Sequence, residues 1–504
     1  MKNKFIMMLI TTIITLFAAV AVANAADSGT CGENLKWSLD DEGVLTILGT
    51  GEMYDYTADN TPPWYYWRND IKSIVINSGV TRIGNRAFNK CRVEEVYIPT
   101  SITSMGTLAF GNCSYLDAVY IQSLEKWCNI DFESGSANPL DGSRELYVYG
   151  NYSSTLVIPD GVTTIKQYAF YGYRDVKYLK LPNSVTTIED SAFETCDHLQ
   201  TVTLPDSVTL IGKKAFYKCE SLYSINFPRD LEEIGANAFY GTKFTDITLP
   251  NKVKVIGNNA FSNCKALVSV VLPNGVKTIG NNAFSNCTAL VSVVLPDSVT
   301  DLGERAFSNC TALKNVTVGN SVTEIKANTF MACTALESVK LPETLKSIGA
   351  YAFSGCSMLY NFTLPYNIET VAQSSFQNCY NIADVYYLGN ESDFELITIE
   401  TDNDYLLNAT IHYNSVSTGK IEPMILFKSN NGEYELVPIN IPQGSAIIVS
   451  FVRDDICVKC SVTSYTGQSS IPFELIDDFD TIEILAWNST KGMMPEAKKA
   501  SIIK

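Results

Sequence analysis

Histidine is almost absent from this sequence, which has only His198 and His412 in 504 residues. A serine or cysteine nucleophile usually needs a nearby base, and neither histidine lies in a motif that supplies one. The chain also has no phosphate-binding loop and no dinucleotide fingerprint. We therefore expect a protein that is not an enzyme and that uses no cofactor and no metal ion. A hydrolase with paired carboxylates is the least favoured alternative.

Positive charge is also scarce, with 37 Lys and Arg against 54 Asp and Glu and a net charge of -17. Nucleic acids bind basic stripes, and anionic membrane surfaces repel an acidic protein, so neither is an expected partner. Beyond residue 22 no apolar run is long enough to span a membrane. We therefore expect no membrane insertion once the N-terminal segment that contains residues 5–22 is removed.

The leader is an apolar run at residues 5–22, which follows two lysines and precedes an A-x-A pattern ending at Ala25. These features predict a secretory signal peptide over residues 1–25, and hence a secreted or cell-surface protein. An uncleaved membrane anchor is the alternative, because the run approaches the ~20 residues that span a bilayer.

Repetition is what the sequence has in abundance. A Phe, usually preceded by Ala, returns about every 23 residues. It lies at positions 88, 110, 170, 193, 216, 239, 261, 284, 307, 330, 353 and 376. A fixed period of this length indicates a stacked repeat array, in which each turn covers the apolar side of the next.

A single turn, residues 290–310, shows the plan of the repeat. Its alternating apolar residues predict a short strand with one buried face, which Pro296 ends. A second extended piece follows. From Gly303 a turn or short helix directs Ala306, Phe307 and Cys310 inward.

This combination of an L-x-x-V-x-L-P strand, a 23-residue period and an Ala-Phe-x-x-Cys segment resembles the BspA-like leucine-rich repeats of bacterial surface proteins. The resemblance spans residues 71–414. It implies a right-handed solenoid, mostly β with minor α, with a parallel β concave face and short helices or turns on the convex side. It also implies a binding protein that serves adhesion or interaction with host, matrix or microbial surfaces.

Ten of the 14 cysteines lie three residues after a repeat Phe. Stacked turns place them ~5 Å apart with parallel side chains, which are poorly aimed for disulfides. We expect buried free thiols, although secreted proteins often form disulfides instead. Cys457 and Cys460 would point to opposite faces of a strand, which argues against a redox or metal site.

Irregular segments flank and interrupt the array. Residues 26–70 predict an N-terminal β-hairpin cap, whose Trp and Tyr cluster we interpret as core and not as a sugar platform. A variant repeat with a short helix is expected at 123–152 and again in a C-terminal cap at 388–414, and either is a candidate binding element. Residues 415–504 predict a β-sandwich of immunoglobulin or fibronectin type, similar to C-terminal domains of secreted clostridial proteins.

The outward face of the strands can be read from the period. Its middle carries mainly Ser and Thr, whereas tyrosines gather near both ends and supply large contact areas at low entropy cost. The candidate ligand-binding residues are Tyr97, Tyr120, Tyr178, Lys180 and Tyr386. We therefore predict a monomeric binding scaffold for a protein or glycan ligand. The rival hypothesis is a non-catalytic or glycan-binding accessory module of an extracellular enzyme system.

Overall fold

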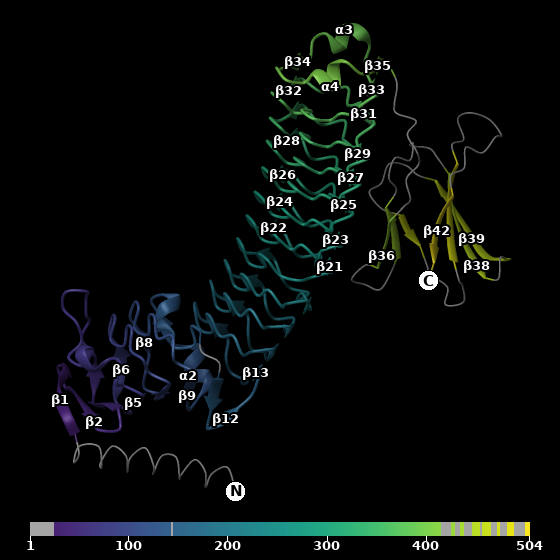
Figure 1. Ribbon diagram of the computed structural model, residues 1–504. Helices are drawn as coiled ribbons and strands as arrows, with labels where there is room; N and C mark the ends of the chain where they lie inside the picture. The colour runs from purple at the N-terminus through teal and green to yellow at the C-terminus, as the bar shows by residue number, and fades with distance from the viewer. Residues whose placement is uncertain are drawn as a thin grey trace. The chain divides into compact units, whose positions relative to one another are not determined.

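The computed structural model describes residues 25–142 and 145–414, and the backbone of several strands between residues 425 and 503. The chain divides into two compact units, Met1–Phe244 and Thr245–Lys504. Together they hold about 15 turns of parallel β-solenoid with little helix (Figure 1). The predicted signal peptide lies outside the described residues.

An antiparallel sheet caps the start of the first unit. β2 (Leu35–Asp40) and β3 (Val44–Gly49) form the expected hairpin, and β1 (Ala25–Gly32) adds a third strand on the outer side of β2. On its other side β3 pairs in parallel with β5 (Ser73–Ile76), which is the first repeat strand. The edge of the first repeat turn is therefore covered by paired backbone.

The aromatic cluster before β5 is mostly core. Trp64 is fully buried and packs edge to face on Trp37 at 5.8 Å between ring centroids. It also stacks on Phe88 at 5.6 Å, and its indole N–H donates to the Ala87 carbonyl at 2.9 Å. These contacts confirm the core interpretation for Trp64, whereas Tyr66 is 83% exposed.

One strand of each turn carries alternate side chains on the outward face of the solenoid, and we call these the outward strands. In the first unit β5 continues into β7 (Glu95–Ile98), β9 (Ala118–Ile121) and β11 (Glu145–Val148), and β12 (Asn151–Tyr152) ends this sheet antiparallel to β11. A separate parallel sheet contains β13 (Thr155–Val157), β15 (Tyr178–Lys180), β17 (Thr201–Thr203) and β19 (Ser224–Ile225). The outward strands of the second unit are β21 (Asp246–Thr248), β23 (Ser269–Val271), β25 (Ser292–Val294), β27 (Asn315–Thr317), β29 (Ser338–Lys340), β31 (Asn361–Leu364), β33 (Asp384–Tyr387) and β35 (Thr410–His412).

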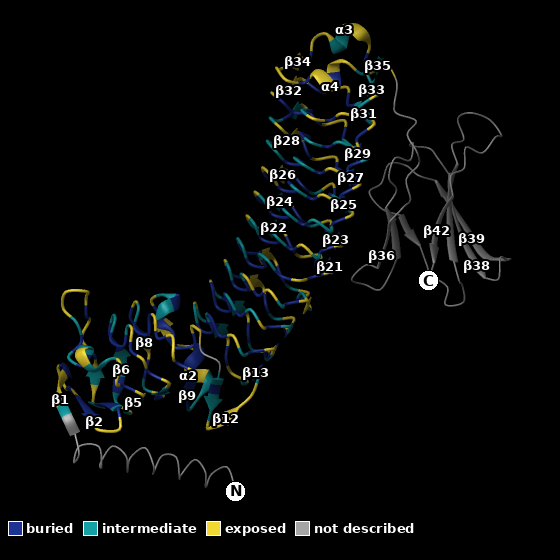
Figure 2. Cartoon of the chain, viewed as in Figure 1, coloured by how far each residue is buried: buried dark blue, intermediate teal, exposed yellow. Residues whose placement is uncertain are grey.

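A second, short strand follows in most turns, as expected. In the first unit these are β4 (Gly51–Glu52), β6 (Val80–Ile83), β8 (Ser104–Met105), β10 (Asp131–Phe132), β14 (Thr164–Ile165), β16 (Thr187–Ile188), β18 (Leu210–Ile211) and β20 (Glu233–Ile234). In the second unit they are β22 (Val255–Ile256), β24 (Thr278–Ile279), β26 (Asp301–Leu302), β28 (Glu324–Ile325), β30 (Ser347–Ile348), β32 (Thr370–Val371) and β34 (Thr398–Ile399). Buried residues line the inside of every turn (Figure 2).

The repeat Phe residues form the centre of each unit's core. All twelve side chains are at most 3% exposed. Nine pairs of neighbouring rings have centroids 5.1–5.7 Å apart, close to the strand spacing, and all of them except the tilted Phe88–Phe110 pair are stacked. The predicted register of the repeat is thereby confirmed.

Around each Phe the backbone forms a turn with two left-handed residues, and not a helix. Hydrogen bonds join these turns to one another, and we call this arrangement the left-handed ladder. The residues two before and two after the Phe have positive φ, as at Arg305 (55°) and Asn309 (60°) around Phe307. The Phe307 N–H donates to the Thr329 carbonyl of the next turn at 2.9 Å, and Asn309 N–H donates to Met331 at 2.8 Å. Asn tolerates positive φ better than most residues, which explains its frequency at these positions.

The cysteine ladder consists of buried free thiols, as predicted. All ten repeat cysteines are at most 8% exposed, and none of them forms a disulfide. In most turns the thiol donates to the carbonyl of the preceding turn's Phe, as Cys310 does to Phe284 at 3.2 Å. Burial raises the pKa of Cys333 to about 12, so the thiol is a poor nucleophile at neutral pH. Cys457 and Cys460 lie outside the residues with described side chains.

The variant turns contain the helices of the array. In the first, α2 (Leu124–Cys128) is capped by the Ser123 side chain, and η2 (Gly135–Ala137) follows β10. In the second, α3 (Glu391–Phe394) precedes β34, and α4 (Asp404–Leu407) follows it. One layout is therefore used twice, as inferred, although a loop had been expected where α4 lies. The remaining helix described is η1 (Tyr65–Trp67), and none of them is long and apolar enough to cross a membrane.

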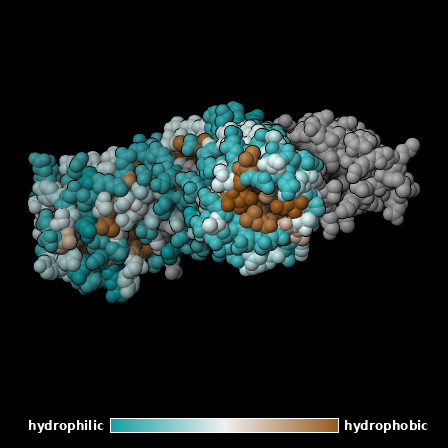
Figure 3. Space-filling view, turned by 90° about the horizontal axis from the view of Figure 1, so that it is seen from above, coloured by the Kyte–Doolittle hydropathy of each residue, from teal (hydrophilic) through white to brown (hydrophobic). Residues whose placement is uncertain are grey.

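The second variant turn lies at one end of the second unit. Among the described residues no further strand pairs with it there, whereas the N-terminal cap adds paired strands at the start of the first unit. Within the described residues, β34 and β35 are the last strands of their sheets. Apolar side chains gather on this end (Figure 3), where Leu396 is 81% and Leu407 is 47% exposed. As a cap, residues 388–414 therefore cover the core, and among the described strands none follows β34 or β35 in its sheet.

Beyond residue 414 only strand backbone is described. The strands are β36 (Ile425–Lys428), β37 (Tyr434–Val437), β38 (Ala446–Arg453), β39 (Ile456–Ser464), β40 (Ile471–Phe473), β41 (Thr481–Trp487) and β42 (Lys499–Ile503). They pair antiparallel in the orders β36-β37-β40 and β39-β38-β41-β42. The predicted sandwich domain remains a prediction.

Candidate functional site

Three tyrosines stack on the outward face of the first unit. Tyr97 on β7, Tyr120 on β9 and Tyr147 on β11 occupy the same register position. Their ring centroids are 4.4 and 4.6 Å apart, with interplanar angles of 8° and 14°. In-register parallel strands place equal positions ~4.8 Å apart, which is close to the separation of stacked rings. We call these three residues the tyrosine ladder.

The sequence interpretation missed Tyr147, because the insertion interrupts the 23-residue period before it. A signal was nevertheless present. The segment from Glu145 to Val148 reads Glu-Leu-Tyr-Val, which repeats the Glu-Val-Tyr-Ile of residues 95–98. The structure brings Tyr97 and Tyr120 together as expected and adds Tyr147 as the third ring.

Two carboxylates lie beside the tyrosine ladder. The Tyr97 hydroxyl donates to Glu95 at 3.4 Å, and the Tyr147 hydroxyl donates to Glu145 at 2.7 Å. The hydrogen bond to Glu145 raises the pKa of Tyr147 to about 12, and burial raises the pKa of Tyr97. Both tyrosines are therefore neutral hydroxyl groups at neutral pH. The same position on β9 is Ala118, which leaves a small side chain between the two carboxylates.

Tyr178 and Lys180 are not part of the tyrosine ladder. Both lie on β15, in the separate sheet that starts at β13. Tyr178 is 41% exposed and its register neighbours are Thr155 and Thr201. The antiparallel strand β12 explains the separation, because it ends the sheet that carries the ladder.

Tyr386 belongs to a shorter aromatic stack in the second unit. Its ring lies 4.7 Å from that of His412, at an interplanar angle of 14°. The His412 Nε2 and Asp384 Oδ1 atoms are 2.7 Å apart. Each variant turn thus contributes one ring, Tyr147 or His412, to an aromatic stack with a carboxylate nearby on the outward face. The sequence interpretation identified Tyr386 but did not include His412.

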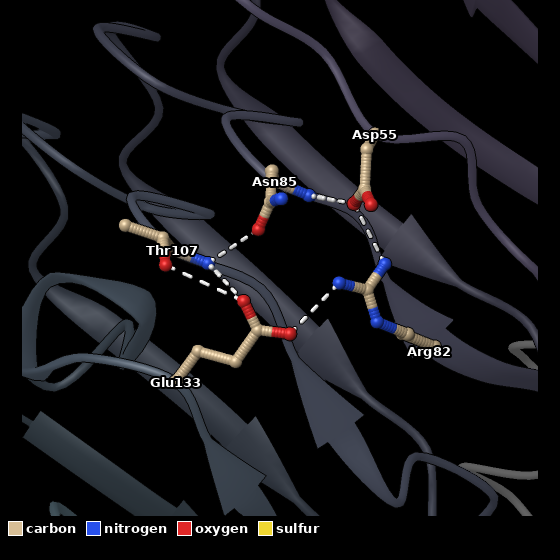
Figure 4. A network of polar contacts seen from close by, with 5 residues as sticks. All are labelled: Asp55, Arg82, Asn85, Thr107 and Glu133. Atoms are coloured by element: carbon tan, nitrogen blue, oxygen red, sulfur yellow. Dashed lines mark hydrogen bonds and ion pairs between the residues drawn. The ribbon is translucent and has the colours of Figure 1, made fainter.

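A polar network fixes the first variant turn to the turns before it (Figure 4). Arg82 bridges Asp55 at 2.7 Å and Glu133 at 2.9 Å. The Asn85 N–H donates to Asp55, while the Thr107 N–H donates to both Asn85 and Glu133. Since Arg82 is only 16% exposed, this network joins the segment after β10 firmly to β6.

The described residues contain no cluster typical of a metal site. Within residues 25–142 and 145–414, no three His, Cys, Asp or Glu side chains converge in a way that could hold an ion. The outward aromatic stacks are therefore the features with the chemistry of a binding site, through aromatic area and hydroxyl groups.

The repeat pattern identifies the family. It matches the model of the BspA type leucine rich repeat region (6 copies) over residues 63–137, 144–268 and 255–383. These ranges include more than half of the 504 residues. The chain belongs to the BspA-type leucine-rich repeat family. The resemblance seen in the sequence is thereby confirmed for the repeats.

Three solved structures are similar to this BspA-type chain. A leucine-rich repeat protein from Eubacterium ventriosum is 26% identical; the match covers 81% of this chain and 100% of that one, with a TM-score of 0.49. A leucine rich cell surface protein from Faecalibacterium prausnitzii is 26% identical, with coverages of 75% and 99% and a TM-score of 0.42. The pneumococcal vaccine antigen PcpA is 17% identical, with coverages of 78% and 100% and a TM-score of 0.38. Among curated proteins none matches this chain.

Proposed function

We propose that this BspA-type protein is a secreted or cell-surface binding protein that contacts its ligand through the tyrosine ladder, without catalysis. The expected signal peptide supports the location, as does the cell-surface description of the Faecalibacterium relative. The ligand we propose is a host, matrix or microbial surface molecule, bound by a monomer.

The stacked, half-exposed rings of Tyr97, Tyr120 and Tyr147 are the observation that carries this proposal. Tyrosine is enriched at the energetic centres of interfaces. Stacking already restricts these rings in the free protein, so binding costs little further side-chain entropy. The network around Arg82 adds to this rigidity by holding the neighbouring insertion in place.

The test is a ligand screen followed by paired substitutions. The chain without its leader is screened against surface proteins and a glycan array. Tyr97→Ala with Tyr120→Ala should weaken binding of the captured ligand by about 2 kcal/mol or more. Ser269→Ala with Ser292→Ala, on the outward face of the second unit, is the matched control and should change binding little. Equal losses from both pairs, or no loss from the tyrosine pair, would reject the site.

The rival function, an accessory module of an extracellular enzyme system, makes a different prediction. It requires capture of a structural glycan or of another secreted protein of the same cell, and not of a foreign surface molecule. The same screen separates the two functions by the identity of what is captured. Light scattering on the purified chain tests the proposed monomer.

A further inference from the structure

The faces of the ladder rings are already occupied. Tyr120 has Tyr97 on one face and Tyr147 on the other. The remaining side of Tyr147 is approached by Tyr152 at 5.9 Å and 50°, and Val75 lies opposite Tyr97 in the register. Stacking of a sugar requires an open ring face. The ladder instead presents ring edges and hydroxyl groups, so its geometry does not suit that mode of glycan binding.

The polar groups on this face are acceptors with negative charge. Glu95 and Glu145 are half-buried and lie two strands apart, which corresponds to about 9–10 Å between their backbones. Ala118 occupies the position between them. In the part of the chain that the structure describes, neither carboxylate has an ion pair with Lys or Arg.

Building on the proposed function, we infer that the tyrosine ladder binds a protein segment through an arginine side chain, whose guanidinium lies over Ala118 between Glu95 and Glu145. A guanidinium presents five N–H donors in one plane, and both carboxylates and tyrosine hydroxyl oxygens accept such bonds. Pairing with a cation also compensates the half-buried carboxylates. Glycans with uronic or sialic acid groups would be repelled by the same charges. Among the two ligand classes expected from the sequence, the site therefore favours protein.

The experiment uses the full chain without its leader, carrying ¹³C-labelled tyrosine rings. The probes are N-acetyl-arginine amide, its glutamine analogue, and maltohexaose as a neutral glycan. We expect saturable shifts of the Tyr97, Tyr120 and Tyr147 signals with arginine at millimolar concentration, and none with the other two probes. Assignments come from single Tyr→Phe variants.

Matched charge variants test the role of the carboxylates. Glu95→Gln with Glu145→Gln should weaken arginine binding at least tenfold. Glu304→Gln with Glu343→Gln removes the same charge from exposed positions of the second unit and should leave binding unchanged. Equal weakening by both pairs would mean general electrostatic attraction and would overturn the inference. Saturable shifts with maltohexaose would also overturn it.

The result is separable from the proposed function. If Tyr97→Ala with Tyr120→Ala weakens the captured ligand but arginine produces no saturable shift, the ladder is a binding site of another chemistry and only the arginine inference fails. If neither effect appears, both are refuted. Circular dichroism of each variant confirms that it keeps the fold of the parent chain.

Discussion

Truncation of a single repeat Phe should destabilise the protein strongly. Phe307 is fully buried, and its ring stacks on Phe284 at 5.3 Å and on Phe330 at 5.7 Å. Phe→Ala substitutions in cores cost about 3–5 kcal/mol, and each aromatic pair contributes about 0.5–1.5 kcal/mol beyond burial. Because two ring pairs are lost, Phe307→Ala should cost about 4–5 kcal/mol, in the upper part of the range.

The structure also explains why the cavity should not collapse. The Phe307 N–H is bonded to Thr329 of the next turn, and the flanking Arg305 and Asn309 hold left-handed conformations with ladder bonds of their own. The backbone is therefore held from both sides, and relaxation into the space left by the ring is restricted. Cavities that cannot relax lie at the costly end of such series.

Guanidinium unfolding followed by circular dichroism measures this effect, with Val291→Ala as control. Val291 is 39% exposed and should lose less than about 1 kcal/mol. Repeat arrays do not always unfold in one step, so hydrogen exchange of residues 284–330 gives the local free energy independently. A loss below about 1 kcal/mol for Phe307→Ala would show that the stacked Phe column is not the core.

Three further predictions concern the ladders and the polar network. Iodoacetamide should leave the ten repeat thiols unmodified in native protein but label most of them after denaturation without reductant; masses that show paired cysteines would contradict this. Arg305→Gly should raise the unfolding free energy by about 0.5–1 kcal/mol, because its φ is 55°, whereas a lower midpoint would refute the left-handed assignment. Burial tends to raise the pKa of the Asp55 carboxyl group. The hydrogen bonds from Asn85 and Arg82 and the charge of Arg82 outweigh this effect and lower that pKa in the folded state. Its stabilisation is thus full above the unfolded pKa of about 3.9 and is lost as pH falls through the folded value; Asp55→Asn should flatten this part of the pH dependence measured by thermal unfolding.

The repeating part of the fold could be predicted from the sequence because each turn solves the same packing problem. Only a residue of fixed size fits between two identical neighbours, so the positions of Phe307 and Cys310 recur and reveal the period. The direction of the strand side chains follows from alternation, and Ser292 and Val294 face outward as expected.

The left-handed ladder was not predicted, because backbone conformation is only weakly encoded by side-chain type. Asn259, Asn263, Asn282 and Asn286 carried a signal for positive φ, but Lys214 adopts the same conformation without any such preference. β1 was not predicted either, because it lies outside the 23-residue period. It pairs with β2 and covers the outer edge of that strand, a contact that no local sequence pattern indicates. Tyr147 was missed for a different reason, because its strand follows an insertion that interrupts the 23-residue period.

The position of the site follows from the constraints on a regular turn. Inside the array every inward position is fixed by stacking, and outward positions such as Thr203 and Val271 stay small or of medium length. The variant turns interrupt the array with helices, and each contributes one ring, Tyr147 or His412, to an aromatic stack that begins on the preceding strands. The stacked Phe column of the regular turns thus supplies stability, while the variant turns complete the outward aromatic stacks. Exchanging Tyr120 and Tyr147 for Thr should therefore remove ligand binding and lower the unfolding free energy by about 1–3 kcal/mol for the two lost ring pairs, which is less than the loss from Phe307→Ala.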